Sequence, residues 1–230
     1  MAQTLQTVDR GYVGEVGSVD QRNKVLRNTY WLLALSMLPT VLGAWVGVTT
    51  GVVATLGVGM SAIVFLGGAF AFMYAIEKTK NSAAGVPILL AFTFFMGLML
   101  SRMLSFVLGL SNGPGLIMMA FAGTGLVFFG MAALSSIIKR DLSTMGKFLF
   151  IGAVLVLVAS IANIWLQSAT LMITLSVLVI GIFSAFIIYD LQRVKNGQET
   201  NYITATLGVY LSVYNVFSAL LSIFGLTSRE

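Results

Sequence analysis

The 230 residues of this chain are 58% hydrophobic and only 9% charged, which is too apolar for a water-soluble domain of this size. The absence of cysteine and histidine excludes disulfides, thiol chemistry, the usual zinc sites and a histidine proton relay. The net charge of +5 is read as a signal of membrane topology and not of nucleic-acid binding, because the basic residues are unevenly distributed along the chain.

The chain opens on a polar segment, residues 1–28, without the short apolar core and small-residue cleavage site of a secretory signal. Acidic and basic residues alternate in it, among them Asp9, Arg10, Glu15 and Asp20. We therefore expect a cytoplasmic tail that stays on the protein. An extended chain advances about 3.3 Å per residue, so such a tail has a long reach.

Seven apolar stretches follow the tail, and each is close to the ~20 residues that a helix needs to cross the hydrocarbon of a bilayer. They are Tyr30–Val48, Val52–Ile76, Ala84–Leu110, Leu116–Ile138, Phe148–Leu166, Leu171–Tyr189 and Ile203–Leu226. The pattern predicts an all-α membrane protein with a seven-helix transmembrane domain over residues 29–226 and a short C-terminal end, residues 227–230.

The connections between these stretches are alternately charged and uncharged. Of the thirteen Lys and Arg residues, all but Arg102 and Arg229 fall on one side of the predicted membrane. The positive-inside rule then places the N-terminus in the cytoplasm and, with an odd number of spans, the C-terminus in the periplasm. A re-entrant seventh segment, which would return the C-terminus to the cytoplasm, is the alternative.

Pro39 and a series of glycines interrupt the apolar character of the first spans. Pro39 lies in the middle of the first span and predicts a kink or a locally opened backbone. Gly43, Gly47 and Gly51 recur at four-residue intervals and provide surfaces on which helices approach closely. Packing is the default interpretation of these glycines, with hinges for gating as the alternative.

Two charged residues lie in or beside the apolar core. Asp190 closes the sixth span, and a carboxylate there is costly unless it is hydrated or paired. It is either a desolvated proton sensor or an interfacial residue paired with Arg193, and both interpretations stay open. Arg102 lies in the outer half of the third span, away from Asp190 and Glu77, and is expected to snorkel to the outer surface.

The seventh segment carries a stripe of small and polar residues at alternating steps of four and three. The stripe consists of Asn201, Ala205, Gly208, Ser212, Asn215, Ala219 and Ser222. Helical geometry puts them on one face, which we expect to point into the bundle. Ala205, Gly208, Ala219 and Ser222 are candidate packing positions, and backbone contacts and interhelical hydrogen bonds are expected to satisfy Ser212 and Asn215. A polar pathway along this helix is the functional alternative to simple packing.

No enzyme class fits these residues. Intramembrane serine proteases and zinc proteases need histidine, which the chain lacks. An intramembrane aspartyl protease needs a second membrane aspartate beside Asp190, but Asp9, Asp20 and Asp141 lie in the tail or in a loop. We expect no catalytic residue, no metal site and no cofactor.

Several motifs resemble those of the Bax inhibitor-1 family, most closely its bacterial YccA-like branch. The C-terminal motifs are the more specific ones: Phe186–Asp190, Asn201–Ile203 and Tyr210–Phe217, with Leu220, Leu221 and Gly225. Lys24–Tyr30, Val127–Phe129, Lys139–Leu142, Ala162–Ile164 and Gly197–Tyr202 support them. The resemblance covers nearly the whole chain.

This resemblance implies six helices around a central seventh, in the bacterial inner membrane. It also implies a non-enzymatic protein that binds and restrains the membrane-bound protease FtsH, together with the HflK/HflC complex. The protease would engage the cytoplasmic tail, with Asp9, Arg10, Glu15 and Asp20 as the candidate residues. Membrane lipid is the other expected partner, and no nucleic acid is expected.

Other members of the family suggest an alternative, a pH-sensitive calcium leak whose sensor is a pair of aspartates. Asp190 matches the first aspartate of that pair, but Ser212 stands at the second position. Without a neighbouring like charge the coupled titration of a pair is not expected. The resemblance therefore favours the protease modulator, with Asp190, Ser212 and Asn215 as the candidate polar axis or proton sensor.

Overall fold

The computed structural model describes residues 2–138, 142 and 144–228, and their side chains from residue 19 onward. The described residues form helices joined by short connections, with no strand among them. The helices are α1 (Ala2–Thr50), α2 (Val52–Thr55), α3 (Gly57–Thr79), α4 (Gly85–Leu108), α5 (Gly113–Ile137), α6 (Met145–Leu166), α7 (Ala169–Lys195) and α8 (Tyr202–Thr227). Within the described residues, 7 helices are long and apolar enough to cross a membrane, which confirms the predicted seven-helix fold class.

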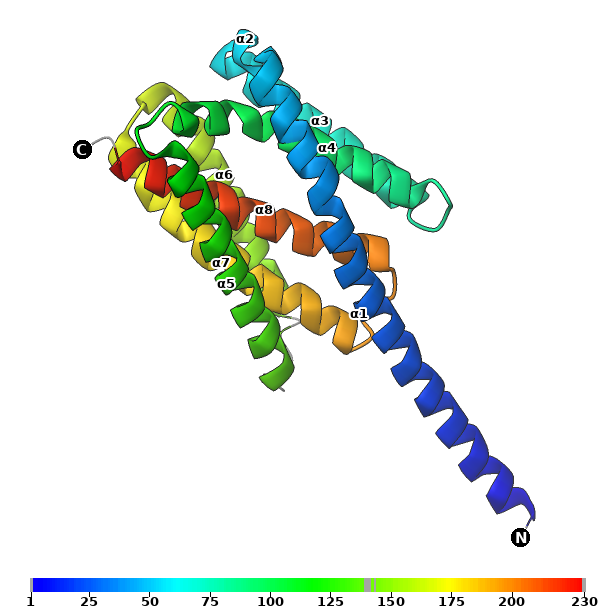
Figure 1. The fold of residues 1–230 in the computed structure, drawn as a ribbon. Coiled ribbons are helices and arrows are strands. Elements are labelled where there is room, and N and C mark those ends of the chain that lie inside the picture. The colour runs from blue at the N-terminus through cyan, green and yellow to red at the C-terminus, as the bar shows by residue number, and fades with distance from the viewer. Residues whose placement is uncertain (1, 139–141, 143, 229–230) are drawn as a thin grey trace.

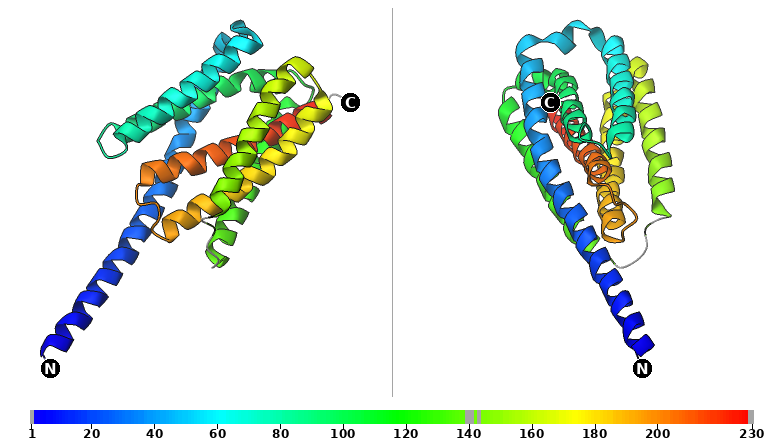
Figure 2. Two further views of the ribbon diagram at one scale, coloured as in Figure 1. Left: turned by 180° about the vertical axis from the view of Figure 1, so that it is seen from behind. Right: turned by 90° about the vertical axis from the view of Figure 1, so that its right-hand side faces the viewer.

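Helix α8 forms the centre of the bundle. It packs against α1, α3, α4, α5 and α7, while α6 joins the bundle mainly through α7 (Figures 1 and 2). No residue from Asn201 to Leu226 is exposed. The last helix is therefore surrounded by the others, and it is a single unbroken helix rather than a re-entrant element.

Burial of α8 extends beyond the stripe of small residues. Val209 and Leu221 are fully buried and Tyr210 is 1% exposed, although all three lie off that stripe. Leu221 packs in a cluster with Val107 of α4 and Leu116 of α5. The sequence pattern predicted one interior face for this helix, but the apolar faces are interior as well because helices cover α8 on several sides.

Helices α1 and α4 approach so closely that their backbones touch. A Cβ atom placed on Gly43 of α1 would overlap the carbonyl oxygen of Phe94 in α4, and one on Gly97 of α4 would overlap the carbonyl oxygen of Thr40 in α1. Gly47 likewise faces α4, whereas Gly51 has a φ of +66° and stands where α1 ends. Small residues at a helix crossing thus make close contact here, as in other membrane helices.

The second predicted stretch, Val52–Ile76, is not one continuous helix. Gly57 adopts a φ of +71°, a conformation that residues with a side chain rarely adopt, and it separates the single turn α2 from α3. The spanning helix is α3, and α2 forms a corner between α1 and α3. The number of spans is unchanged.

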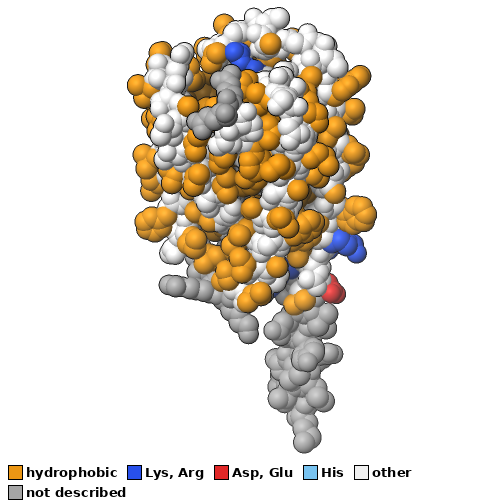
Figure 3. All heavy atoms as spheres, turned by 60° about the vertical axis from the view of Figure 1, so that its left-hand side comes forward, with side chains coloured by type: hydrophobic (Ala, Val, Ile, Leu, Met, Phe, Trp, Pro, Cys, Tyr) orange, Lys and Arg blue, Asp and Glu red, His pale blue; other side chains and the backbone are white. Residues whose placement is uncertain are grey.

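The apolar surface and the charged residues occupy different parts of the molecule. Hydrophobic side chains cover the body of the bundle (Figure 3). Examples are Phe70 of α3, Phe129 of α5 and Phe148 of α6, which are 62%, 71% and 75% exposed. Such a surface suits contact with lipid acyl chains and is consistent with a multi-pass membrane protein.

The charged end of the bundle is the end with the α3–α4 and α7–α8 connections. Arg22 of α1 lies there, with its Nε 3.1 Å from a Cβ placed on Gly197 in the α7–α8 connection. Beyond this level the N-terminal turns of α1 extend past the other helices (Figure 1). With 49 residues, α1 is about 73 Å long at 1.5 Å per residue, well over the ~30 Å of bilayer hydrocarbon.

We predict that Gly43→Ala destabilises the bundle, because the added methyl group would have to push α4 away from α1. The expected loss is about 1 to 3 kcal/mol of unfolding free energy, as for other overpacked sites. Gly125→Ala in α5 is the matched control, since a Cβ there meets no other heavy atom within 4 Å. Thermal unfolding of the purified variants in detergent checks this, and equal stability of the two would contradict the close contact of α1 and α4.

Candidate functional site

Asp190 lies against the backbone of α8. It is five residues before the end of α7, and a Cβ placed on Gly208 would lie 2.8 Å from its Oδ2 and 3.1 Å from its Cγ. The missing side chain of Gly208 thus provides the space that the carboxylate occupies. Within the part of the chain that the structure describes, the Asp190 carboxylate makes no hydrogen bond and no ion pair.

Arg193 is not the partner of Asp190. Its Nη2 lies 3.6 Å from Oε2 of Glu199, and its guanidinium group lies 5.7 Å from the centre of the Tyr189 ring. The ion pair between Asp190 and Arg193, which the sequence left open, is therefore not formed. Arg193 pairs instead with Glu199, which lies in the α7–α8 connection. The residue spacing within α7 could not predict this partner.

Ser212 and Asn215 continue the stripe above Gly208. Ser212 is 2% exposed, and its Oγ donates a hydrogen bond to the carbonyl oxygen of Gly208 at 3.1 Å. Asn215 donates from Nδ2 to the carbonyl oxygen of Leu211 at 2.7 Å. Both bonds stay within α8, where the carbonyl one turn back is always in reach, and they replace the interhelical bonds expected from the sequence.

Three of the four packing positions of the stripe are buried, and Gly208 is half-buried. Ala205, Ala219 and Ser222 are 4%, 5% and 6% exposed. The hydroxyl oxygen of Ser222 has no hydrogen-bond partner among the described residues. The stripe thus faces the interior of the bundle, and it brings Gly208 against Asp190.

Two tyrosines of α8 make polar contacts with α1 and α4. Tyr210 Oη lies 2.9 Å from Thr40 Oγ1 of α1 and donates to the carbonyl oxygen of Thr93 in α4 at 3.4 Å. Tyr214 Oη donates to the carbonyl oxygen of Met96 in α4 at 3.3 Å. These contacts were not predicted from the sequence, although two tyrosines four residues apart in an apolar span indicate one face whose hydroxyl groups need partners.

Asn201 joins the start of α8 to the α3–α4 connection. Its Oδ1 accepts hydrogen bonds from the backbone N–H groups of Ile203 and Thr204 at 2.9 and 3.2 Å, which caps the helix. Its Nδ2 donates to the carbonyl oxygen of Lys80 at 3.0 Å and to Oδ1 of Asn81 at 2.9 Å. The first residue of the stripe therefore fixes two connections together at the charged end.

The ends of α5 and α7 are joined in a similar way. Lys195 Nζ donates to the hydroxyl oxygens of Ser135 and Ser136 at 2.9 and 2.7 Å. Gln192 Nε2 donates to the carbonyl oxygen of Ile138 at 2.9 Å. Together with Asn201, these residues hold the charged end of the bundle around Asp190.

Arg102 extends to the opposite end of the bundle. Its Nη1 lies 3.5 Å from Ser61 Oγ, near the start of α3. It pairs with neither Asp190 nor Glu77, and Glu77 forms an ion pair with Lys80 instead. This agrees with the depth argument that separated Arg102 from both carboxylates.

The tail residues are described only in part. The side chains of Asp9, Arg10 and Glu15 lie outside the described residues, and Asp20 is exposed on α1. The backbone of α1 continues as one helix across residue 28, where the tail was expected to meet the first span.

Comparison with known proteins decides the family. The family model described as "Inhibitor of apoptosis-promoting Bax1" matches residues 22–229, which is nearly the whole chain. The chain belongs to the Bax inhibitor-1 family. Asp190 and the helices α2 to α8 lie within the matched region, together with α1 from residue 22 onward.

Curated bacterial relatives cover almost the same length. The "Modulator of FtsH protease YccA" of Escherichia coli K12 is 38% identical over 208 residues, which are 90% of this chain and 92% of that protein. An uncharacterized membrane protein of Vibrio cholerae is also 38% identical, over 91% of this chain and 92% of its own. An uncharacterized protein of Pseudomonas aeruginosa is 37% identical over 90% of both chains. The names of this family and of YccA describe an inhibitor and a modulator, not an enzyme.

We predict that the two roles of Asn201 separate in hydrogen exchange. Asn201→Ser keeps a cap acceptor for the first turn of α8 but loses both donors to the α3–α4 connection, whereas Asn201→Ala loses the cap as well. Loss of a cap costs about 1 kcal/mol, or several-fold in the local opening equilibrium. The amides of Ile203 and Thr204 should therefore exchange faster in Asn201→Ala than in Asn201→Ser, as measured by mass spectrometry. Equal exchange of these amides in the two variants would show that Asn201 is not the cap.

Proposed function

We propose that this chain binds the membrane-bound protease FtsH and restrains its action on other membrane proteins. The observation that carries the proposal is the 38% identity to the FtsH modulator YccA of Escherichia coli, which extends over 90% of this chain. The similarity covers the bundle as a whole and not an isolated motif. The proposed role is binding and not catalysis. The protease is proposed to be in complex with HflK and HflC.

The N-terminal part of α1 is the segment that we propose the protease engages. Its turns extend past the charged end of the bundle (Figure 1), and its charged residues Asp9, Arg10, Glu15 and Asp20 would meet the protease. The same helix continues into the α1–α4 contact, where Gly43 and Gly97 let the two backbones touch. The segment that the protease would bind is thus part of a helix that the contact with α4 anchors in the bundle.

The proposal places the charged end of the bundle in the cytoplasm and the C-terminus in the periplasm. Support comes from the basic residues, because Arg22 and Lys80 lie at the end where α1 leaves the bundle. The positive-inside rule assigns such an end to the cytoplasm.

We predict that deletion of residues 2–20 weakens the effect of the chain on FtsH. Full-length protein should copurify with FtsH and slow the decay of an FtsH membrane substrate, measured by pulse-chase in cells. The truncated chain should lose most of this effect while it still inserts into the membrane. Deletion of residues 227–230, at the other end, is the control and should leave the effect intact. If no form copurifies and the substrate decays at one rate throughout, the modulator function is wrong.

A second candidate function is a pH-sensitive cation leak, calcium being the cation tested, with Asp190 as the proton sensor. The observation in its favour is a carboxylate that lies against the backbone of α8 at Gly208 without a hydrogen bond or ion pair among the described residues. The charges of Arg193 and Glu199 act on Asp190 from the same end of the bundle. Ser212, one turn further along α8, supplies a hydroxyl group and no second carboxylate.

We predict that Asp190→Asn removes the pH dependence of any calcium flux that the purified chain supports in liposomes. The amide of asparagine has nearly the size of the carboxylate but does not gain or lose a proton over the pH series. Asp20→Asn is the matched control, since Asp20 is an exposed acidic residue of α1 and should leave the flux unchanged. Flux that is absent, or that is the same for the native chain and Asp190→Asn over a pH series, eliminates the leak with Asp190 as its sensor.

A further inference from the structure

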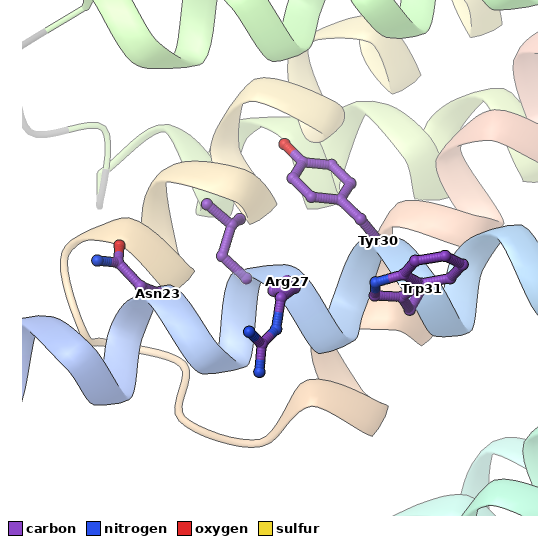
Figure 4. Close-up of a pocket in the computed structure, with 5 residues that line it drawn as sticks. Asn23, Arg27, Tyr30 and Trp31 are labelled. Atoms are coloured by element: carbon purple, nitrogen blue, oxygen red, sulfur yellow. The ribbon is translucent and has the colours of Figure 1, made fainter.

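A shallow depression lies on the surface of α1 near the charged end. Asn23, Leu26, Arg27, Tyr30 and Trp31 line it, and its volume is about 370 Å³ (Figure 4). All five residues belong to the part of α1 just before it enters the apolar body of the bundle. Neither the Asp190 site nor the N-terminal turns of α1 form part of it.

The lining is mostly apolar, and Arg27 and Asn23 are its polar residues. Arg27 and Asn23 are exposed, and neither makes a hydrogen bond or ion pair with any residue that the structure describes. Trp31 is 73% exposed, and the ring of Tyr30 contacts Phe128 of α5 with the centroids 6.3 Å apart. Arg27, a cation with free donors, thus lines the same depression as the rings of Tyr30 and Trp31. A ligand with an anionic head and an apolar body is complementary to such a lining.

The position along α1 puts the depression at the edge of the bilayer. Trp31 is 73% exposed and is the first tryptophan along α1 from the charged end. Exposed tryptophans mark the levels where hydrocarbon meets headgroups. Arg27 is one turn before Trp31, toward the charged end, and therefore lies at the depth of the lipid phosphates.

We infer that this depression binds the headgroup of an anionic phospholipid, in the leaflet at the charged end of the bundle. Arg27 contacts the phosphate, because its guanidinium group offers a planar fork of donors that matches phosphate oxygens. Asn23 donates a further hydrogen bond from its amide. The upper part of the acyl chain lies along Trp31, which gives the lipid an apolar contact that a free phosphate ion lacks.

The inference is tested on full-length protein in a neutral detergent, by native mass spectrometry during titration with phosphatidylglycerol. The first phosphatidylglycerol should bind more tightly than phosphatidylcholine, and Arg27→Gln should weaken it about tenfold, since a charge-assisted bidentate contact is lost. Arg27→Lys keeps the charge without the fork and should weaken binding less. Lys147→Gln is the matched control, because Lys147 is an exposed cation on the first turn of α6 and should leave the first binding event unchanged.

The remaining arms make the outcome decisive. Excess inorganic phosphate should fail to displace the bound phosphatidylglycerol, and displacement would overturn the lipid assignment in favour of an ion site. Because Arg27 and Trp31 are exposed, Arg27→Gln and Trp31→Ala should have the same thermal unfolding temperature as the native chain. Trp31→Ala provides a second test, through the apolar part of the lining. Equal affinity of the native chain, Arg27→Gln and Trp31→Ala for phosphatidylglycerol would overturn the inference.

Discussion

The structure depends on enclosing one helix, α8, that has no exposed residue from Asn201 to Leu226. In a bilayer the hydrophobic effect does not drive one helix against another, because lipid tails are as apolar as the side chains. Close van der Waals contact and hydrogen bonds must hold the helices together. The small residues of α8 provide the first, and the hydroxyl groups of Tyr210 and Tyr214, which reach carbonyl oxygens of α4, provide the second.

The setting of Asp190 follows from this enclosure. A carboxylate so close to the hydrocarbon needs space and some polar surroundings, and Asp190 finds space on the side of α7 that faces α8. Gly208 leaves the space, and the backbone of α8 lies beside the carboxylate. Ser212 donates its hydroxyl proton to the carbonyl oxygen of Gly208. The arrangement differs physically from two facing carboxylates, whose mutual repulsion couples their protonation.

Features that depend on one segment were predictable from the sequence, and features that depend on pairs of segments were not. The number of spans follows from the length and apolarity of each stretch, and the inward stripe of α8 follows from its own periodicity. The partner of Arg193 comes from the α7–α8 connection, and the partners of Tyr210 come from α1 and α4, which no local pattern specifies. The break at Gly57 was missed because a glycine in an apolar run is compatible with both a helix and a corner.

Helix α1 links the parts of the molecule that the proposals concern. It extends past the charged end at its N-terminus, lines the surface depression with Arg27 and Trp31, and then meets α4 through Gly43 and Gly47. The N-terminal turns and the contact with α4 belong to one continuous helix, so a force on those turns would reach that contact along α1. That contact is the most extensive between any two helices of the described chain, and there the backbones touch. Resistance to extraction, as the proposed restraint of FtsH requires, would then be a property of the α1–α4 interface rather than of the polar segment that the protease grips.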